Sequence, residues 1–381
     1  DNNHQRTLTL RAARGLLFDR DGQILVENRY SFDISLVREQ AGDLTRSIEL
    51  LSAISGVDEP SLWQTIEEHN DEPEYRPIVM IREATTEQVA AVLARRIELP
   101  GIVVEEVPTR HYRTGKLAAH LFGYVGEITE TQISEVQFRG TPSGAIVGQT
   151  GIEQAYNREL MGTDGTRRVV VNSIGRELNT IEEVNPVEGR RLQLTIDYDL
   201  QVATEEAFRA HGFNGAAVIL EPNTGEILAM ASVPSYDPND FSLGIDQATW
   251  QRLNDDPQKP LHNRTLQGRY APGSTFKLVV AVAALEEGIV ESDFSVQCNG
   301  AKRFYDRSYH CHLRGGHGRL MMEAALERSC NVYFYTLGSM LDIDVLNTWA
   351  RRLGLGDLTG IDLPHELEGI VPSRQWKMKT T

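Results

Sequence analysis

The stretch RYAPGSTFKLVVAVAALEEG, Arg269–Gly288, places one serine and one lysine at the start of an apolar run. The Pro-Gly pair before the serine interrupts any preceding element, so a helix is expected to begin at Ser274. Lys277 follows three residues later, and helical spacing puts its amine on the same face as the serine hydroxyl. Residues 278–285 are apolar on every side, which predicts a helix enclosed by the rest of its domain.

Two interpretations of this segment compete. In the first, Ser274 caps the helix and Lys277 extends its amine to the surface. In the second, Lys277 is held partly desolvated beside Ser274, its pKa falls, and it accepts the proton of the hydroxyl. A lone S-x-x-K tetrapeptide is common by chance, so the rest of the chain has to decide between them.

Composition excludes several classes of protein. The chain has 381 residues, enough for two or three domains, with 40% hydrophobic and 24% charged residues. The formal net charge of −16, without a long basic cluster, argues against a nucleic-acid partner. The longest purely apolar run is too short to span a membrane, and no signal peptide is visible at Asp1. Any membrane anchor is therefore expected to lie outside this chain.

The first half of the chain has the pattern of a scaffold. Residues 14–36 predict two β-strands around an Asp-Gly turn, and residues 43–68 and 85–97 have helical spacing. His120 lies among apolar and small residues and is interpreted as a structural histidine. No catalytic constellation is found before residue 190.

The second half predicts a sheet with helices. The segment GAAVILEPNTGEILAMAS, residues 215–232, is a strand, a turn and a second strand, and helices are expected at 321–328 and 331–340. The sequence therefore predicts an α+β protein of two domains. Residues 1–190 form a non-catalytic domain, and residues 191–381 form a domain whose antiparallel sheet is flanked by helices.

A second serine motif, Ser329-Cys330-Asn331, lies in the segment ERSCNVYFY. An S-x-N triplet alone is equally compatible with a helix N-cap. The combination is more specific: S-x-x-K opening a helix, preceded by a β-hairpin and followed about fifty residues later by S-x-N, is typical of penicillin-binding proteins and class A β-lactamases.

Three segments of the chain resemble the transpeptidase domain of class B penicillin-binding proteins: RYAPGSTFK, GAAVILEPNTGEILAMAS and SYDPN. Three earlier segments resemble the elongated, non-catalytic pedestal (dimerisation-type) domain of that family: RGLLFDRDGQILVEN, RHYRTGKLAAHLFGYVGEI and GQTGIEQAYNRELMGTDG. β-Lactamases lack such a pedestal. Within class B, NRTLQGRYAPGSTFK and RGGHGRLMMEAALERS are most similar to the cell-elongation transpeptidases of Gram-negative bacteria.

The resemblance implies a peptidoglycan D,D-transpeptidase that cross-links stem peptides through an acyl-serine intermediate and is inhibited covalently by β-lactams. Ser274 would be the nucleophile and Lys277 its general base. Ser329 would relay a proton to the leaving amine, and Asn331 would hydrogen-bond the lysine or the donor peptide. A serine β-lactamase, a β-lactam sensor and a catalytically silent scaffold remain as alternatives.

The chain departs from the family pattern at the third motif, K-[ST]-G. Lys379-Thr380-Thr381 lacks the glycine and follows Asn331 too closely to leave room for the intervening helices. We therefore give it no role and expect the C-terminal part of the transpeptidase domain to be incomplete in this chain.

The resemblance also implies a cellular setting. Expected partners are peptidoglycan stem peptides, β-lactam antibiotics and, through the pedestal, a glycosyltransferase of the elongation machinery and a periplasmic scaffold protein. The expected location is the periplasmic face of the bacterial inner membrane, with a single-pass anchor outside this chain. Arg14, Asp19 and Gly151 of the pedestal should matter for packing and partner contacts and not for chemistry.

All three cysteines of the chain lie near the second motif. Cys298, Cys311, His317 and Cys330 follow the spacing C-x12-C-x5-H-x12-C. Three thiolates and an imidazole make a complete tetrahedral set for structural zinc, with no open position for catalysis. The chemistry itself would need no cofactor.

Other assignments of the cysteines stay open. The thiols are alternatively unrelated, or two form a disulfide and one is left over, and His310 and His312 are rival ligands. If the motif begins a helix, Cys330 points away from Ser329 and Asn331. A zinc ion there would then hold both residues in place.

Overall fold

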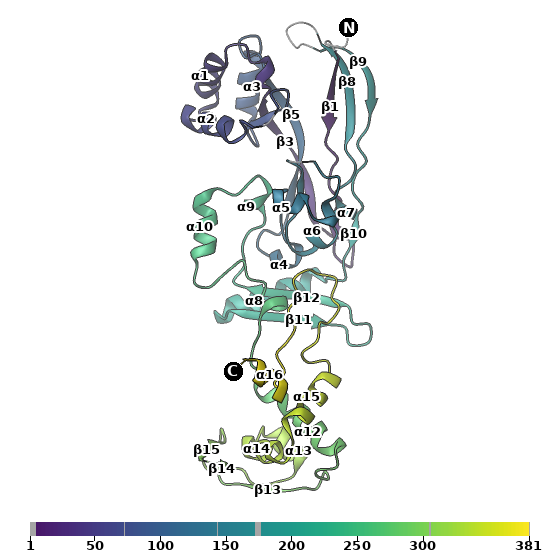
Figure 1. Ribbon diagram of the computed structural model, residues 1–381, viewed down its shortest axis with the longest axis vertical. Helices are drawn as coiled ribbons and strands as arrows, with labels where there is room; N and C mark the ends of the chain where they lie inside the picture. Colours follow the sequence, from purple (N-terminus) through teal and green to yellow (C-terminus); the bar gives the residue numbers. More distant parts are fainter. Residues whose placement is uncertain (1–4, 72, 143, 172–176, 305, 381) are drawn as a thin grey trace. The chain divides into compact units, whose positions relative to one another are not determined.

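The computed structural model describes residues 5–71, 73–142, 144–171, 177–304 and 306–380 (Figure 1). Its contacts divide the chain into two compact units, Asp1–Thr265 and Leu266–Thr381. The division predicted at residue 190 stays a prediction. Within the described ranges, every helix is too short or too polar to cross a bilayer.

The first unit begins with the predicted hairpin. Strands β2 (Leu17–Phe18) and β3 (Ile24–Leu36) pair in antiparallel fashion. Asp19 shapes the turn between them, because its Oδ1 accepts a 3.0 Å hydrogen bond from the backbone N–H of Asp21. The predicted strand pair around the Asp-Gly turn is confirmed.

The long strand β3 organises the sheet of the first unit. It pairs with β4 (Ile78–Ile81) and with β5 (Ile102–Tyr112), and β10 (Leu192–Gln193) adds to β2 in parallel. Three helices pack apolar faces against one end of this sheet (Figure 1): α1 (Leu44–Ser55), α2 (Glu59–Glu68) and α3 (Thr86–Ala94). Residues 43–68, where helical spacing was predicted, form the two helices α1 and α2, since Gly56 ends α1 in the left-handed conformation.

A second sheet of the first unit has the order β1-β8-β9. Its strands are β1 (Gln5–Leu10), β8 (Gly165–Val171) and β9 (Glu177–Val184). The first unit also contains an antiparallel hairpin of β6 (Val125–Glu127) and β7 (Ile146–Gly148). Its remaining short helices are η2 (Arg38–Gln40), α4 (Ala119–Phe122), α5 (Glu130–Ile133), η3 (Val136–Phe138), α6 (Gly151–Ala155) and α7 (Asn157–Leu160).

A fully buried carboxylate connects the three signature segments of the pedestal. Glu153 accepts hydrogen bonds from Arg14 Nε at 2.5 Å and from Arg110 Nε at 2.6 Å. Burial acts to raise the pKa of Glu153, but the guanidinium groups of Arg110 and Arg14 outweigh it and hold the pKa below its ordinary value. Gly151 has φ +58°, and an added Cβ would lie 2.5 Å from the Leu121 carbonyl oxygen. The segments therefore meet in one packed junction.

The predicted hairpin at 215–232 is present as β11 (Gly215–Leu220) and β12 (Ile227–Val233). Helix α8 (Tyr198–His211) lies along β12, and its buried Gln201 hydrogen-bonds both backbone groups of Met230: Oε1 accepts from N at 2.7 Å, and Nε2 donates to O at 3.0 Å. Helices α9 (Asn239–Ser242), α10 (Gln247–Asp255) and α11 (Arg264–Gln267) follow.

The second unit carries both serine motifs. The 3-10 turn η4 (Gly273–Thr275) leads into α12 (Phe276–Glu286). Helices α13 (Met322–Glu327) and α14 (Asn331–Met340) confirm the predictions at 321–328 and 331–340. The remaining elements are β13 (Val296–Cys298), β14 (Ala301–Phe304), β15 (Arg307–His310), β16 (Gly318–Leu320), α15 (Ile343–Arg352) and α16 (Arg374–Thr380).

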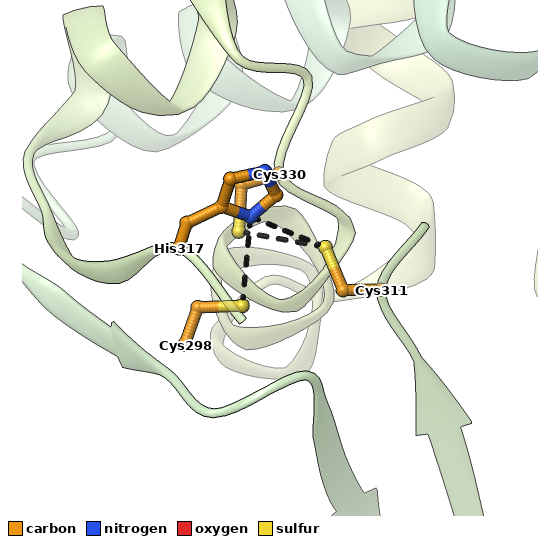
Figure 2. Close-up of side chains that lie close together, drawn as sticks. All are labelled: Cys298, Cys311, His317 and Cys330. Atoms are coloured by element: carbon orange, nitrogen blue, oxygen red, sulfur yellow. Dashed lines mark hydrogen bonds between the residues drawn. The ribbon is translucent and has the colours of Figure 1, made fainter. Parts of the chain in front are cut away.

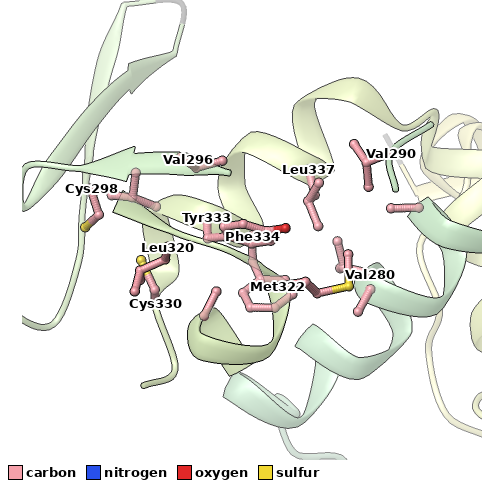
Figure 3. Close-up of a cluster of buried hydrophobic side chains, with 14 of the residues drawn as sticks. Val280, Val290, Val296, Cys298, Leu320, Met322, Cys330, Tyr333, Phe334 and Leu337 are labelled. Carbon is pink, nitrogen blue, oxygen red and sulfur yellow. The ribbon is translucent and has the colours of Figure 1, made fainter. Parts of the chain in front are cut away.

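The core of the second unit forms between α12, α13 and α14 (Figure 3). Val280 of α12 belongs to the same buried cluster as Met322, Phe334 and Leu337. The expectation that α12 is enclosed on every side is wrong for the described structure, because Leu278 is 58% exposed. An all-apolar run shows that a helix is compatible with burial, but it does not fix how many of its faces are covered.

Candidate active site

Ser274 lies exposed in the 3-10 turn that precedes α12. The N-cap of α12 is Thr275, and neither this residue nor the N-cap of the turn makes a side-chain capping hydrogen bond. The interpretation of Ser274 as a helix cap is therefore wrong, and its hydroxyl is available for other contacts.

Lys277 is the second residue of α12 and points its amine at the S-x-N motif. Its Nζ donates to the Ser329 carbonyl oxygen at 2.7 Å, to Ser329 Oγ at 2.9 Å and to Asn331 Oδ1 at 2.7 Å. An ammonium has three N–H donors, so one short segment uses all of them. The lysine does not extend to the surface as the first interpretation required.

Ser329 joins the two motifs. Its hydroxyl donates a 3.0 Å hydrogen bond to Ser274 Oγ, while Lys277 is bound to its other side. Among the contacts of the described residues, Lys277 reaches Ser274 through Ser329 and makes no direct hydrogen bond to it. The chain Lys277–Ser329–Ser274 is thus the path along which a proton can move.

Partial burial lowers the pKa of Lys277 below its ordinary value. The neighbouring thiols of Cys311 and Cys330 act in the opposite direction and raise the pKa. A lowered pKa makes the neutral amine more accessible, as a general base requires.

The backbone at Ser329 is in the left-handed region, with φ +49°. This conformation costs free energy for a residue other than glycine, and such residues cluster at functional sites. The next residue, Cys330, is the N-cap of α14 and makes no side-chain capping bond. Ser329 is therefore not the N-cap of α14, and helix capping does not explain the S-x-N triplet.

The side chain of Cys330 lies in a cluster with Cys298, Cys311 and His317 (Figure 2). His317 Nδ1 lies 3.7 Å from Cys298 Sγ and 3.5 Å from Cys311 Sγ, and the Sγ atoms of Cys311 and Cys330 are 4.0 Å apart. All three cysteines are buried and free. Burial raises the pKa of the Cys330 thiol to about 12.

The two nitrogen–sulfur distances fit the edges of a zinc tetrahedron, and the sulfur–sulfur distance is slightly longer than such an edge. With Zn–S bonds of about 2.3 Å and a Zn–N bond of about 2.0 Å, tetrahedral geometry places neighbouring ligand atoms roughly 3.5–3.8 Å apart. The rival ligand His312 has its Nδ1 3.9 Å from Cys311 Sγ and lies outside the set whose ligand atoms are mutually within 4.8 Å. The structure brings together the four residues that the spacing predicted.

One contact of the site had no signal in the sequence. Asn331 Nδ2 donates a long hydrogen bond of 3.4 Å to the carbonyl oxygen of His310, at the end of β15. Any residue type supplies a carbonyl oxygen, so composition and spacing do not reveal this partner. Lys379, by contrast, lies in helix α16 and not on a strand, and Thr381 falls outside the described residues.

Two family matches cover most of the chain. Residues 9–194 match the penicillin-binding protein dimerisation domain, and residues 215–381 match the penicillin-binding protein transpeptidase domain. The chain therefore belongs to the penicillin-binding proteins that combine these two domains, as the sequence resemblance predicted.

The chain is similar to curated proteins that share one name. Proteins named peptidoglycan D,D-transpeptidase MrdA are 33% identical in Acinetobacter baumannii and 31% identical in Escherichia coli, over 100% of this chain. The chain spans 56% and 60% of the length of these two relatives.

Solved structures point to the same branch. Penicillin-binding protein 2 of Helicobacter pylori, solved in complex with MreC, is 30% identical with a TM-score of 0.85, over 98% of this chain and 70% of that one. Penicillin-binding protein 2 of Pseudomonas aeruginosa, in complex with WCK 5153, is 31% identical with a TM-score of 0.68, over 98% and 63%. The predicted similarity to the elongation transpeptidases is confirmed.

Proposed function

We propose that this protein is a peptidoglycan D,D-transpeptidase that cross-links stem peptides during cell elongation. The observation that carries the proposal is the hydrogen-bonded chain from Lys277 Nζ through Ser329 Oγ to Ser274 Oγ, with steps of 2.9 and 3.0 Å. Nucleophile, relay and base are thus within hydrogen-bonding distance of their neighbours.

In the acylation step, neutral Lys277 accepts a proton through Ser329, and Ser274 Oγ attacks the carbonyl carbon of the penultimate D-alanine. The backbone N–H of Ser274, in the 3-10 turn before α12, would donate a hydrogen bond to the oxyanion. The C–N bond to the terminal D-alanine then breaks, and Ser329 returns the proton to the leaving amine.

In the second step, the amine of a neighbouring stem peptide attacks the ester carbonyl. Its excess proton passes back to Ser274 Oγ as the ester bond breaks, and the new amide is the cross-link. A β-lactam acylates the same serine, but its opened ring keeps the leaving nitrogen attached to the acyl group. The enzyme is therefore inhibited covalently.

Labelling with a fluorescent penicillin tests this function. The label should appear on the peptide that contains Ser274 and persist for hours, whereas rapid turnover would indicate a β-lactamase and no label a silent scaffold. A β-lactam sensor would also keep its label, so the second readout is release of D-alanine from a stem pentapeptide. A labelled protein that releases no D-alanine would favour the sensor.

We also propose that Cys298, Cys311, His317 and Cys330 hold a structural zinc ion. The distances between the ligand atoms support the proposal, and so does the ligand set of three thiols and one imidazole, which zinc prefers. The ion would supply no step of the reaction. It would fix the backbone at Cys330 and so the positions of Ser329 and Asn331 on either side.

Metal analysis of protein purified without a histidine tag tests the zinc proposal. We expect about one equivalent of zinc, and a clear loss in the Cys330→Ser variant. Less than a tenth of an equivalent of zinc in the unmodified protein, or a Cys298–Cys311 disulfide detected by mass spectrometry, would contradict the zinc proposal.

The cellular setting is part of the same proposal. We place the protein at the periplasmic face of the inner membrane, with stem peptides and β-lactams as its ligands. A scaffold protein and a glycosyltransferase would contact the pedestal. Support comes from the similar Helicobacter pylori protein, which was solved with MreC, and from a 29% identical chain of a peptidoglycan synthase complex that coordinates polymerization and crosslinking.

A further inference from the structure

The β14–β15 hairpin is fastened to helix α14 beside the active site. Lys302 Nζ donates a 2.9 Å hydrogen bond to Thr336 Oγ1, and the rings of Tyr309 and Tyr335 lie 5.6 Å apart. Thr336 is 8% exposed, and its own hydroxyl donates to the Val332 carbonyl oxygen at 2.8 Å. A lone pair of the Thr336 oxygen is therefore directed at Lys302, and it fixes one end of that side chain.

The same hairpin ends at the carbonyl group that meets Asn331. The amide of Asn331 donates from Nδ2 to the His310 carbonyl oxygen and accepts at Oδ1 from Lys277 Nζ. An amide has one donor end and one acceptor end. The carbonyl of His310 therefore selects the orientation in which the Asn331 oxygen faces Lys277, and the opposite orientation would turn N–H groups toward the ammonium.

We propose that Lys302 is a positioning residue for the active site: by tying the hairpin to α14, it keeps the His310 carbonyl against Asn331 and the Asn331 oxygen turned toward Lys277. The proposal rests on the proposed function, since its kinetic effect is measured at Ser274. Lys302 lies 5.4 Å from the centre of the Phe304 ring, so its partly buried charge has an aromatic face and a hydroxyl as partners.

Acylation kinetics with a fluorescent penicillin test the proposal. Lys302→Met removes the ammonium but keeps the length of the side chain, and Thr336→Val removes the acceptor at nearly constant shape. Each should lower the limiting acylation rate about tenfold, the usual weight of one hydrogen bond, and leave the dissociation constant of the initial complex within about twofold.

Three further variants separate positioning from general stability. Lys302→Arg retains a donor and should keep at least half of the rate. The double variant should be no slower than the slower single variant, because both remove one contact. Arg303→Met changes the exposed neighbour on the opposite face of the strand and should leave the rate unchanged.

A second readout does not depend on acylation. In protein labelled with ¹⁵N-asparagine, the side-chain amide signal of Asn331 should shift in Lys302→Met and stay in place in Arg303→Met. An unshifted signal, or a Lys302→Met rate within twofold of the unmodified rate, would overturn the positioning role. If the unmodified protein is not acylated at all, the proposed function fails, and the amide signal still decides the role of Lys302.

Discussion

The hydroxyl of Ser329 donates a 3.0 Å hydrogen bond to the hydroxyl of Ser274 across 55 residues of the chain. Two motifs that are each weak alone therefore meet at one point. Their distances assign different tasks to the two serines, since one has an exposed oxygen and the other lies between that oxygen and the lysine.

Replacing Ser274 with alanine should abolish the covalent penicillin adduct. The substitution removes one exposed hydroxyl, so the fold and the thermal unfolding midpoint should stay close to those of the unmodified protein. Mass spectrometry of the penicillin-treated variant is the measurement. An undiminished adduct would exclude Ser274 as the nucleophile.

Replacing Lys277 with alanine should slow acylation by about two to four orders of magnitude, which is the usual contribution of a general base. The variant also leaves Ser329 and Asn331 without the donor that they share. Stopped-flow fluorescence with a labelled penicillin measures the rate. Acylation at nearly the unmodified speed would contradict the role of base.

Replacing Glu153 with glutamine should destabilise the pedestal by about 3–5 kcal/mol, because Arg14 and Arg110 then lose the buried carboxylate that they share. Urea denaturation measures the loss. Acylation of the protein that remains folded should be unchanged.

Asp19→Ala serves as a milder pedestal variant beside Glu153→Gln. It removes hydrogen bonds to the turn after β2 and should cost about 1–2 kcal/mol. Loss of penicillin acylation in a folded, soluble Asp19→Ala protein would contradict the separation between packing and chemistry.

His120 should make the stability of the first unit depend on pH. Burial lowers its pKa from 6.5 to about 4, and its Nε2 contacts the Pro260 carbonyl oxygen at 2.7 Å. Below pH 6.5, His120 binds a proton in the unfolded chain but stays neutral in the folded chain. Stability is therefore full above pH 6.5 and falls by up to roughly 3 kcal/mol as the pH drops toward 4.

The matched variant for this prediction is His120→Gln, whose amide can still donate to the Pro260 carbonyl but does not titrate. Urea unfolding midpoints at pH 7.5 and pH 5 should differ less in the variant than in the unmodified protein. Equal differences in both proteins would assign the pH dependence to other groups.

Local chemistry explains which parts of the fold the sequence could predict. The turns at Asp21-Gly22 and at Pro222-Asn223 each stand between two β-rich apolar runs, so both hairpins were predictable. The thiol cluster was predictable from spacing, because all cysteines of the chain take part in it.

Contacts between distant segments were not predictable in the same way. Glu153 meets Arg14 and Arg110 across 139 and 43 residues, and a buried ion pair has no local pattern that announces its partners. The enclosure of α12 was predicted wrongly for a related reason: the exposed Leu278 is as apolar as the buried Val279 and Val280, and which of them is covered depends on the packing of distant segments.

The contact of Gln201 with Met230 has a consequence for how the β11–β12 hairpin can grow. Two residues on the outer edge of β12 already have hydrogen-bond partners. The Leu228 carbonyl oxygen accepts from the backbone N–H of Asp197, and both backbone groups of Met230 bond to Gln201, so these groups cannot pair with a further strand. A strand that joins this hairpin, from the same polypeptide or from another molecule, would find the groups of Leu228 and Met230 already bonded, which favours pairing alongside β11. Sheet extension at this hairpin is therefore directional.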